Sequence, residues 1–284
     1  MATSEETIEA VANCLVRAGS CLRADKKRAY ERAIATEKDA TAKWLLQTLL
    51  LNGELAEKNQ SPLCDDTGIP HALLEFGGTR TLDSGLISDI HTGIARGLAL
   101  LPGRPMAVKG DDQARLGQTL GMFDDPAAVE MAPLAIRQVP EDVLRLHVLM
   151  FGGGPAIRGR SFRVFHKHDA AIVEAEIVTW AIEACKQLGC TPSTLAIGIG
   201  RSHYEAANLM LQAQVDGSHD VQSELEQRIT NAVNESGVGA MGIGGRATVL
   251  GTFVAVGPAR ASGVRIVCMR PCCCVEPRLA SVDL

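Results

Sequence analysis

The sequence lacks the features that mark several broad classes of protein. Lysine and arginine number 28 against 33 aspartate and glutamate residues, so the formal net charge is -5, without the basic excess that nucleic acid or an anionic membrane requires. No run of 18 or more apolar residues is present, and the acidic start MATSEETIEA lacks the basic and apolar regions of a signal peptide. These absences predict a cytoplasmic protein that acts on small molecules or on other proteins.

The chain also lacks the cysteine pattern of a disulfide-stapled domain, and it has no internal repeat or low-complexity linker. Its nine cysteines form an odd set at uneven spacing in a chain without an export signal, which favours metal or cluster ligation over a disulfide framework. With 284 residues, of which 46% are hydrophobic and 21% charged, the chain is long enough to bury a sizeable core.

The hydrophobic pattern predicts an α/β fold, with mixed sheets flanked by helices and a helical N-terminal segment. Residues 1–57 are expected to be helical, because apolar residues recur there at helical spacing. Residues 58–284 mix short strand-like segments with helices, of which 169–188 is the clearest, with Asp169 as its N-cap. We expect one domain over residues 1–284, in which the helical part packs on the α/β part.

Three glycine-rich stretches, at 151–155, 197–201 and 242–246, raise the possibility of a nucleotide site. None has the lysine and hydroxyl of a phosphate-cradling loop, and none is followed by an acidic residue at the distance of a dinucleotide-binding fold. We therefore interpret them as tight turns or as places where the backbone closely approaches a ligand.

Cys64, Cys190 and Cys272 stand in or beside predicted turns, and Cys272 begins a Cys-Cys-Cys run. Their separations are 126 residues (190 minus 64) and 82 residues (272 minus 190), which excludes a zinc knuckle or a ferredoxin-type run but permits a site built from three loops. In SPLCDDTGIP the acids Asp65 and Asp66 disfavour a thiolate, whereas coordination to a metal would deprotonate the sulfur. Spacing alone leaves open that these are ordinary buried or turn cysteines.

Four segments carry a resemblance to class I fumarases and L-tartrate dehydratases, the oxygen-sensitive iron-sulfur hydro-lyases. LLLNGELAEKNQSPLCDDTG resembles the entry to their Cys-Gln-Asp-Thr-Gly motif, and FGGGPAIRGRSF resembles their Lys-Gly-Gly-Gly-Ser segment. LGCTPSTLAIGIG is similar to their Gly-Cys-Pro-Pro and Gly-Ile-Gly-Gly segments, and VGAMGIGGRATVLG to their Met-Gly-hydrophobic-Gly-Gly-Lys-Thr-Thr segment. The segments occur in the family's order between residues 49 and 274, most of the chain.

The resemblance implies a 4Fe-4S cluster with three protein ligands and one iron open to a substrate hydroxyl and carboxylate. The implied ligands are Cys64, Cys190 and Cys272, with Cys273 or Cys274 as alternatives for the third after a small shift in alignment. The implied substrate-binding and catalytic residues are Asp65, Asp66, Arg104, Gly154 and Arg260.

Several positions depart from the family pattern. Asp65 stands where the family has glutamine, Phe151 where it has lysine, and Arg260 where it has an active-site histidine. Because these changes exchange hydrogen-bond type as well as charge, the choice among fumarate, tartrate and related hydroxy acids stays open.

The resemblance implies the α-type chain of a two-component hydro-lyase for a small dicarboxylic acid. A β-type chain, in an α2β2 or similar assembly, would supply the proton-abstracting base. One alternative is a diverged relative that serves as a non-catalytic binding or assembly subunit. Another is a metal-free isomerase or lyase that uses its acids for general acid and base catalysis.

Overall fold

The computed structural model describes residues 3–284, and their contacts divide the chain into two compact units. Unit 1 comprises the described residues up to Cys21, together with Gly53–Gly152 and Arg278–Leu284, and unit 2 comprises Leu22–Asn52 and Gly153–Pro277. The division does not follow the predicted boundary after residue 57, because each unit combines segments that are distant in sequence. The single-domain assignment stays a prediction.

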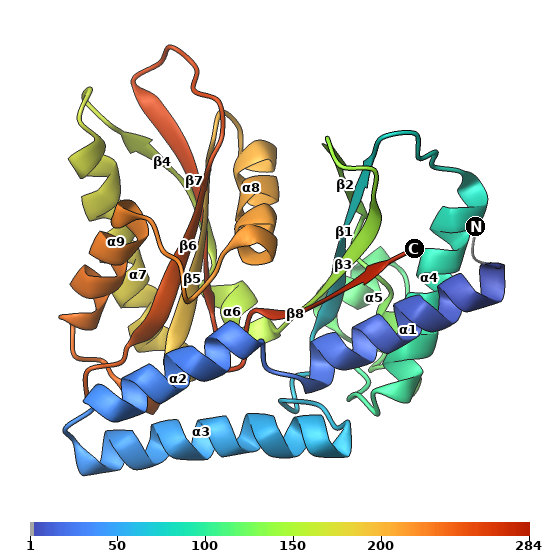
Figure 1. Ribbon diagram of the computed structural model, residues 1–284, viewed down its shortest axis with the longest axis horizontal. Coiled ribbons are helices and arrows are strands. Elements are labelled where there is room, and N and C mark those ends of the chain that lie inside the picture. Colours follow the sequence, from blue (N-terminus) through green and yellow to red (C-terminus); the bar gives the residue numbers. More distant parts are fainter. Residues whose placement is uncertain (1–2) are drawn as a thin grey trace. The chain divides into compact units, whose positions relative to one another are not determined.

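Unit 1 is built on a four-stranded mixed sheet (Figure 1). Its strands lie in the order β2 (Ala135–Val139), β1 (Ile69–Gly77), β3 (Leu144–Phe151) and β8 (Arg278–Asp283). β1 and β2 are parallel, and the other neighbouring strands are antiparallel. The helical elements of this unit are α1 (Ser4–Ser20), α4 (Ser84–Leu100), α5 (Asp112–Gly117) and the 3-10 helix η1 (Pro126–Val129).

The core of unit 1 forms where α1 and α4 pack together and against the sheet. α1 begins with a capping box between Thr3 and Glu6, and its apolar residues then recur at helical spacing. The two helices approach closely because α4 presents glycine at the contact: a Cβ added at Gly93 would lie 2.6 Å from the Cβ of Val11.

Unit 2 is built on a second mixed sheet, with helices on both faces (Figure 1). Its strands lie in the order β4 (Arg160–Phe165), β7 (Val264–Cys272), β5 (Ser193–Gly200) and β6 (Val249–Val256). β5 is parallel to β6 and antiparallel to β7, which is also antiparallel to β4. Its helical elements are α2 (Ala24–Thr36), α6 (Gly153–Arg158), α7 (Ala170–Leu188), α8 (His203–Asp216), α9 (Glu224–Asn234) and η2 (Ala240–Gly242).

The central strand β5 of unit 2 is buried along its whole length. α8 covers one face of the sheet, and α7 and α9 cover the other (Figure 1). Because both faces are covered, the strand reads as a continuous apolar run instead of an alternating one. A Cβ at Gly198 would lie 2.0 Å from the carbonyl oxygen of Ala206, so glycine is needed for α8 to approach the strand. α3 (Ala40–Asn59) contains the boundary between the units.

The predicted fold class is confirmed, since the structure has two mixed sheets flanked by helices. The helix expected at 169–188 is present as α7, and the side chain of Asp169 accepts a hydrogen bond from the backbone N–H of Ala171 as its N-cap. Within residues 3–284, no helix combines the length and the apolar character needed to cross a membrane. The cytoplasmic location stays a prediction.

Candidate functional site

The loop that carries Cys64 in unit 1 is anchored by buried residues on either side of the exposed Asp65 and the half-buried Asp66. The backbone N–H of Leu63 donates to the carbonyl oxygen of Gly19 at 2.9 Å, and both Leu63 and Thr67 are buried. Between them Cys64 is partly exposed, and its thiol donates to Oδ1 of Asp65 across 3.6 Å. The turn therefore presents the thiol and the carboxylates at the surface of unit 1.

Asp65 and Arg104, both predicted site residues, are brought together in unit 1. Nη1 of Arg104 lies 3.3 Å from Oδ2 of Asp65, and the backbone N–H of Arg104 donates to Oγ1 of Thr67 at 2.9 Å. The two side chains are 59% and 82% exposed, so the ion pair itself contributes little to stability. The arginine is nevertheless held beside the loop by its backbone, which leaves its guanidinium available to a carboxylate that displaces Asp65.

Arg278 fixes the backbone of the same loop, and no pattern in the sequence singled this residue out. Its side chain is 1% exposed, its Nη1 donates to the carbonyl oxygen of Asp66 at 2.9 Å, and its Nε donates to that of Met150 at 3.1 Å. Gly68 makes room for it, because a Cβ there would lie 2.6 Å from Nη2 of Arg278 and the φ of Gly68 is +91°. Asp66 is thus fixed through its backbone in this unit.

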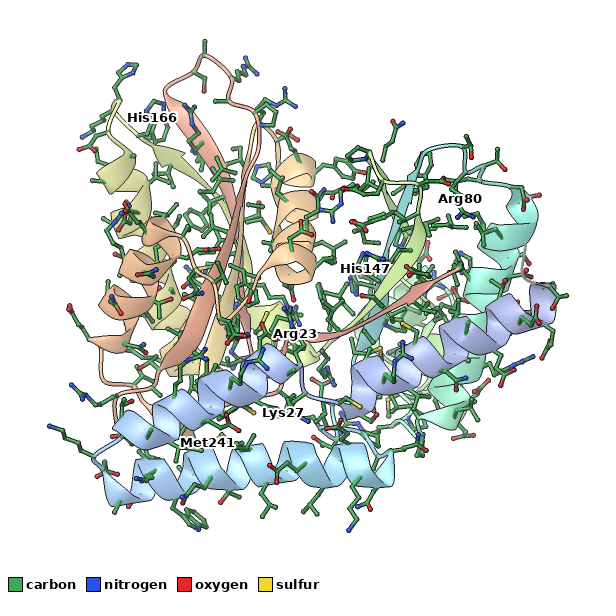
Figure 2. The ribbon with its side chains drawn as sticks, in the orientation of Figure 1. Arg23, Lys27, Arg80, His147, His166 and Met241 are labelled. Carbon is green, nitrogen blue, oxygen red and sulfur yellow. The ribbon has the colours of Figure 1, made fainter. Side chains whose placement is uncertain are left out.

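In unit 2, the turn that carries Cys190 lies directly against the glycine-rich turn after α9. Thr191 is buried, its hydroxyl donates to the carbonyl oxygen of Gly239 at 2.5 Å, and its own carbonyl accepts from the N–H of Met241 at 2.9 Å. Figure 2 labels Met241 in this turn. A Cβ at Gly239 would lie 1.6 Å from the carbonyl oxygen of Gly244, so the turn closes only with glycine.

The Cys-Cys-Cys run meets the Cys190 turn through a backbone hydrogen bond. The N–H of Cys274 donates to the carbonyl oxygen of Cys190 at 2.8 Å. Cys190 is exposed and Cys274 is partly exposed. A hydrogen bond with Cys273, followed by burial, raises the pKa of Cys274, and its charge interacts with that of Cys190. Two of the predicted or alternative ligands are therefore neighbours at the surface of unit 2.

Cys272 lies in a different environment from Cys274. It is fully buried at the end of β7, and its thiol donates to Oε1 of Gln214 on α8 across 3.4 Å. Burial, and next the charge of Glu276, raise its pKa far above the usual range. A sulfur committed to a buried contact is poorly placed to bind an iron that a substrate must reach, whereas Cys274 beside Cys190 fits that requirement.

Side chains from α2 and β5 hold the backbone of residues 272–276, an arrangement that the sequence analysis missed. Ser193 donates to the carbonyl oxygen of Cys272 at 2.6 Å, and Tyr30 donates to that of Cys274 at 2.8 Å. Nζ of the fully buried Lys26 donates to the carbonyl oxygen of Glu276. The sequence signal that could have indicated a shared role is the spacing of Lys26 and Tyr30, which are four residues apart and therefore lie on one face of the helix.

The Lys26 ammonium also joins a buried polar network in unit 2. It lies 3.3 Å from Oγ1 of Thr194, which is 3.0 Å from Nε2 of His219, whose Nδ1 is 3.1 Å from Oδ2 of Asp25. Burial would raise the pKa of Asp25, but hydrogen bonds from His219 and the charge of Arg23 outweigh burial and hold it well below its usual range. Figure 2 labels Arg23 at the start of α2. The network fixes α2 to the end of the sheet that carries the cysteines.

Gly154 and Arg260, the other two predicted site residues of unit 2, do not lie together. Gly154 lies at the start of α6, where an added Cβ would meet only Cδ1 of Leu188 at 4.0 Å. Arg260 lies in the loop between β6 and β7, and β7 begins opposite the C-terminal end of β5. Because Cys190 precedes β5, the length of that strand separates Arg260 from the Cys190 turn within unit 2.

The predicted ligands are divided between the units, with Cys64 in unit 1 and Cys190 and Cys272 in unit 2. In the described part of the chain, no group of three or more His, Cys, Asp or Glu side chains is arranged so that it could hold a metal ion. Among the candidate ligands of unit 2, Cys190 and Cys274 are the two whose backbones are in direct contact.

Comparison with known proteins decides the family. The family model described as fumarate hydratase (Fumerase) matches residues 8–282, nearly the whole chain. The chain belongs to the fumarate hydratase family. This membership confirms the resemblance found in the sequence and the expected enzyme class, a hydro-lyase.

Individual members of the fumarate hydratase family are similar to this chain at modest identity. The putative L(+)-tartrate dehydratase subunit alpha of Methanocaldococcus jannaschii is 26% identical over 244 residues, which cover 82% of each chain. The L(+)-tartrate dehydratase subunit alpha of Escherichia coli K12 is 25% identical, over 77% of this chain and 71% of that one. The putative class I fumarate hydratase of Geobacillus stearothermophilus is 25% identical over 88% of this chain, which spans only 50% of that enzyme.

Proposed function

We propose that this chain is the α-type subunit of an iron-sulfur hydro-lyase that adds water to, or removes it from, a small dicarboxylic acid. Two relatives named as alpha subunits support a partner chain, and we propose a β-type partner in an α2β2 or similar assembly. The observation that carries the proposal is the contact between the Cys190 and Cys274 turns in a chain of this family.

In this proposal Cys64, Cys190 and Cys274 are the three thiolate ligands of a 4Fe-4S cluster, with Cys274 in place of the expected Cys272. The cluster would supply a Lewis acid for the substrate hydroxyl. The carbonyl groups of residues 272–276 are fixed by side chains of α2 and β5, which supports a pre-organised ligand segment. The partly exposed positions of Cys64 and Cys274 agree with a site that substrate can reach.

The residues of the Cys64 loop would bind and orient the substrate. Arg104 would bind one carboxylate in a two-pronged hydrogen bond after that carboxylate displaces Asp65, 3.3 Å away. Asp66, whose backbone is held by Arg278, would orient the hydroxyl that is gained or lost. Gly154 stays a candidate substrate contact by resemblance alone. Arg260, which the resemblance also implied, lies beyond the opposite end of β5 from the Cys190 turn and is left out of the proposed substrate site.

Anaerobic purification of the chain with and without a β-type partner tests the proposal. We expect about four iron and four sulfide per chain after reconstitution, brown colour, and dehydratase activity on tartrate or malate only with the partner. A colourless, iron-free protein would contradict the proposal and favour the alternative of a non-catalytic binding or assembly subunit. Full activity of the chain by itself would contradict the need for a partner.

A further inference from the structure

A pocket of about 270 Å³ lies at the end of the unit 2 sheet where β5 ends and β7 begins. In Figure 1 this is the end of unit 2 opposite to α2. The eight residues of β5 separate it from the Cys190 turn, a distance of about 25 Å along an extended strand. The pocket is thus distinct, within unit 2, from the surface on which Cys190 and Cys274 meet.

Three arginines line this pocket, namely Arg201, Arg260 and Arg265, and no acidic residue is part of its lining. The carboxylate of Glu205 lies just behind the wall, because a Cβ added at the lining residue Gly200 would lie 3.1 Å from its Oε2. Like charges gathered in one concave site repel one another unless a counter-ion lies between them. Glu205 already serves as the counter-ion of Arg201, whereas Arg260 and Arg265 make no ion pair in the described part of the chain, so the charge of these two residues favours an anion.

Hydrogen bonds hold two of the three guanidinium groups in place. Nη1 of Arg265 donates to the carbonyl oxygens of Val264 at 3.1 Å and of Ser262 at 3.4 Å. Arg201 is held by Glu205, a residue of α8 that does not line this pocket, through a bond of 3.0 Å from Nε to Oε2. These contacts orient the two arginines, and the only carboxylate among their partners, that of Glu205, is already engaged with Arg201.

Arg260 differs from Arg201, because its guanidinium makes no ion pair with any residue in the described part of the chain. It is exposed, and its own carbonyl oxygen accepts from Arg265 at 3.4 Å, which ties the loop to that side chain. A guanidinium with free donors beside two oriented ones is suited to an anion with two or more charged oxygens.

We propose that this pocket binds a small dianion, through Arg260 together with Arg201 and Arg265. The volume lies just below the range of pockets for drug-sized ligands, which favours a ligand of a few heavy atoms over a nucleotide. A dicarboxylate and inorganic phosphate share the required chemistry. The proposal does not depend on the iron-sulfur assignment.

Titration calorimetry on the cluster-free chain, at constant ionic strength, tests this site with three probes: succinate, inorganic phosphate and chloride. We expect succinate or phosphate to bind with a Kd on the order of 1 mM, and chloride to bind far more weakly. Comparison of the succinate and phosphate titrations tells which dianion the site prefers. Equal or absent binding of all three would overturn the proposal.

Variants locate the binding. Arg260→Ala should raise the Kd for the dianion by at least about tenfold, because a charge-assisted hydrogen bond contributes about 1.5–3 kcal/mol. Arg260→Lys should restore part of the affinity. The matched control is Arg163→Ala, which removes an exposed arginine of the same unit on β4. Unchanged binding in Arg260→Ala, or an equal loss in Arg163→Ala, would overturn the proposal.

A second pair of variants separates this site from the one proposed for the substrate. Arg104→Ala in unit 1 and Cys190→Ser should leave dianion binding by the cluster-free chain unchanged, whereas both should impair the reconstituted hydro-lyase. Loss of dianion binding in Arg104→Ala, with retained binding in Arg260→Ala, would place the ligand at the Cys64 loop. That result would overturn the proposal that the arginine-lined pocket binds it. Failure of the hydro-lyase assay with retained Arg260-dependent binding would reject only the proposed function.

Discussion

The backbone N–H of Cys274 donates a hydrogen bond to the carbonyl oxygen of Cys190 at 2.8 Å. This contact joins the turn after α7 to the segment after β7, at the end of the sheet that α2 closes. It makes Cys190 and Cys274 neighbours on unit 2, whereas Cys272, two residues before Cys274, is buried. The ligand set proposed for the cluster depends on this relationship.

Serine substitutions distinguish the two candidate ligands in the cysteine run. Cys274→Ser should reduce reconstituted iron and sulfide to about three iron per chain or fewer, because a three-thiolate site loses one of its anchors. Cys272→Ser should retain the cluster, because its thiol contacts Gln214 in the interior. Iron and sulfide analysis with absorbance spectra provides the measurement. Full cluster content in Cys274→Ser, with loss of the cluster in Cys272→Ser, would show that Cys272 is the third ligand, as the sequence predicted.

The ion pair between Asp65 and Arg104 predicts an effect on substrate affinity. Asp65→Gln, which introduces the residue that the family carries there, removes the carboxylate that competes for Arg104 at 3.3 Å. We expect KM for a dicarboxylate to decrease about threefold, because an exposed ion pair is worth at most about 1 kcal/mol. Arg104→Ala should raise KM about tenfold or more. Steady-state kinetics of the assembled enzyme checks both, and a rise of KM in Asp65→Gln would contradict a competing role.

Removal of the buried ammonium of Lys26 should destabilise unit 2. In Lys26→Met the oxygens of Thr194, Cys273 and Glu276 lose a donor and stay buried, which costs about 2 kcal/mol after the desolvation of the ammonium is relieved. Urea unfolding followed by circular dichroism measures the change. The control is Lys38→Met, at an exposed position, which should shift the free energy of unfolding by less than about 0.5 kcal/mol. Equal stability of the two variants would argue against the anchoring role.

His219 predicts a loss of stability in mild acid. Burial lowers its pKa to about 4, and its hydrogen bond with Asp25 only partly opposes this effect. An unfolded histidine titrates near pH 6.5, so between about pH 6.5 and 4 the unfolded chain binds a proton that the native chain does not. The free energy of unfolding should therefore fall as the pH decreases through this window, by about 3 kcal/mol. Asp25 contributes only below its unfolded pKa of about 4.

Urea midpoints measured between pH 4 and 7 test the role of His219. His219→Gln should flatten the dependence in that window, whereas His91→Gln, at an exposed position on α4, should leave it unchanged. The same slope in His219→Gln and in the unmodified chain would show that another group titrates.

Local patterns predicted the regular elements, because helix and strand propensity, caps and periodicity depend on near neighbours. Helix α7 is an example, since Asp169 indicated where the helix begins and the spacing of its apolar residues indicated which face is buried. The same reasoning missed Lys26, His219 and Arg278, because nothing in a local sequence marks a charged residue that long-range packing will bury. Arg278 contacts the carbonyl of Asp66 only because β8 pairs with β3.

The sequence by itself determined the α/β class, the family and the set of cysteines to consider as candidate ligands, because these depend on composition, periodicity and the order of motifs. The tertiary structure alone decided which cysteines are neighbours. The antiparallel pairing of β5 with β7 puts the start of one strand beside the end of the other. It thereby brings Cys190 to Cys274, buries Cys272, and carries Arg260 to the far end of the sheet.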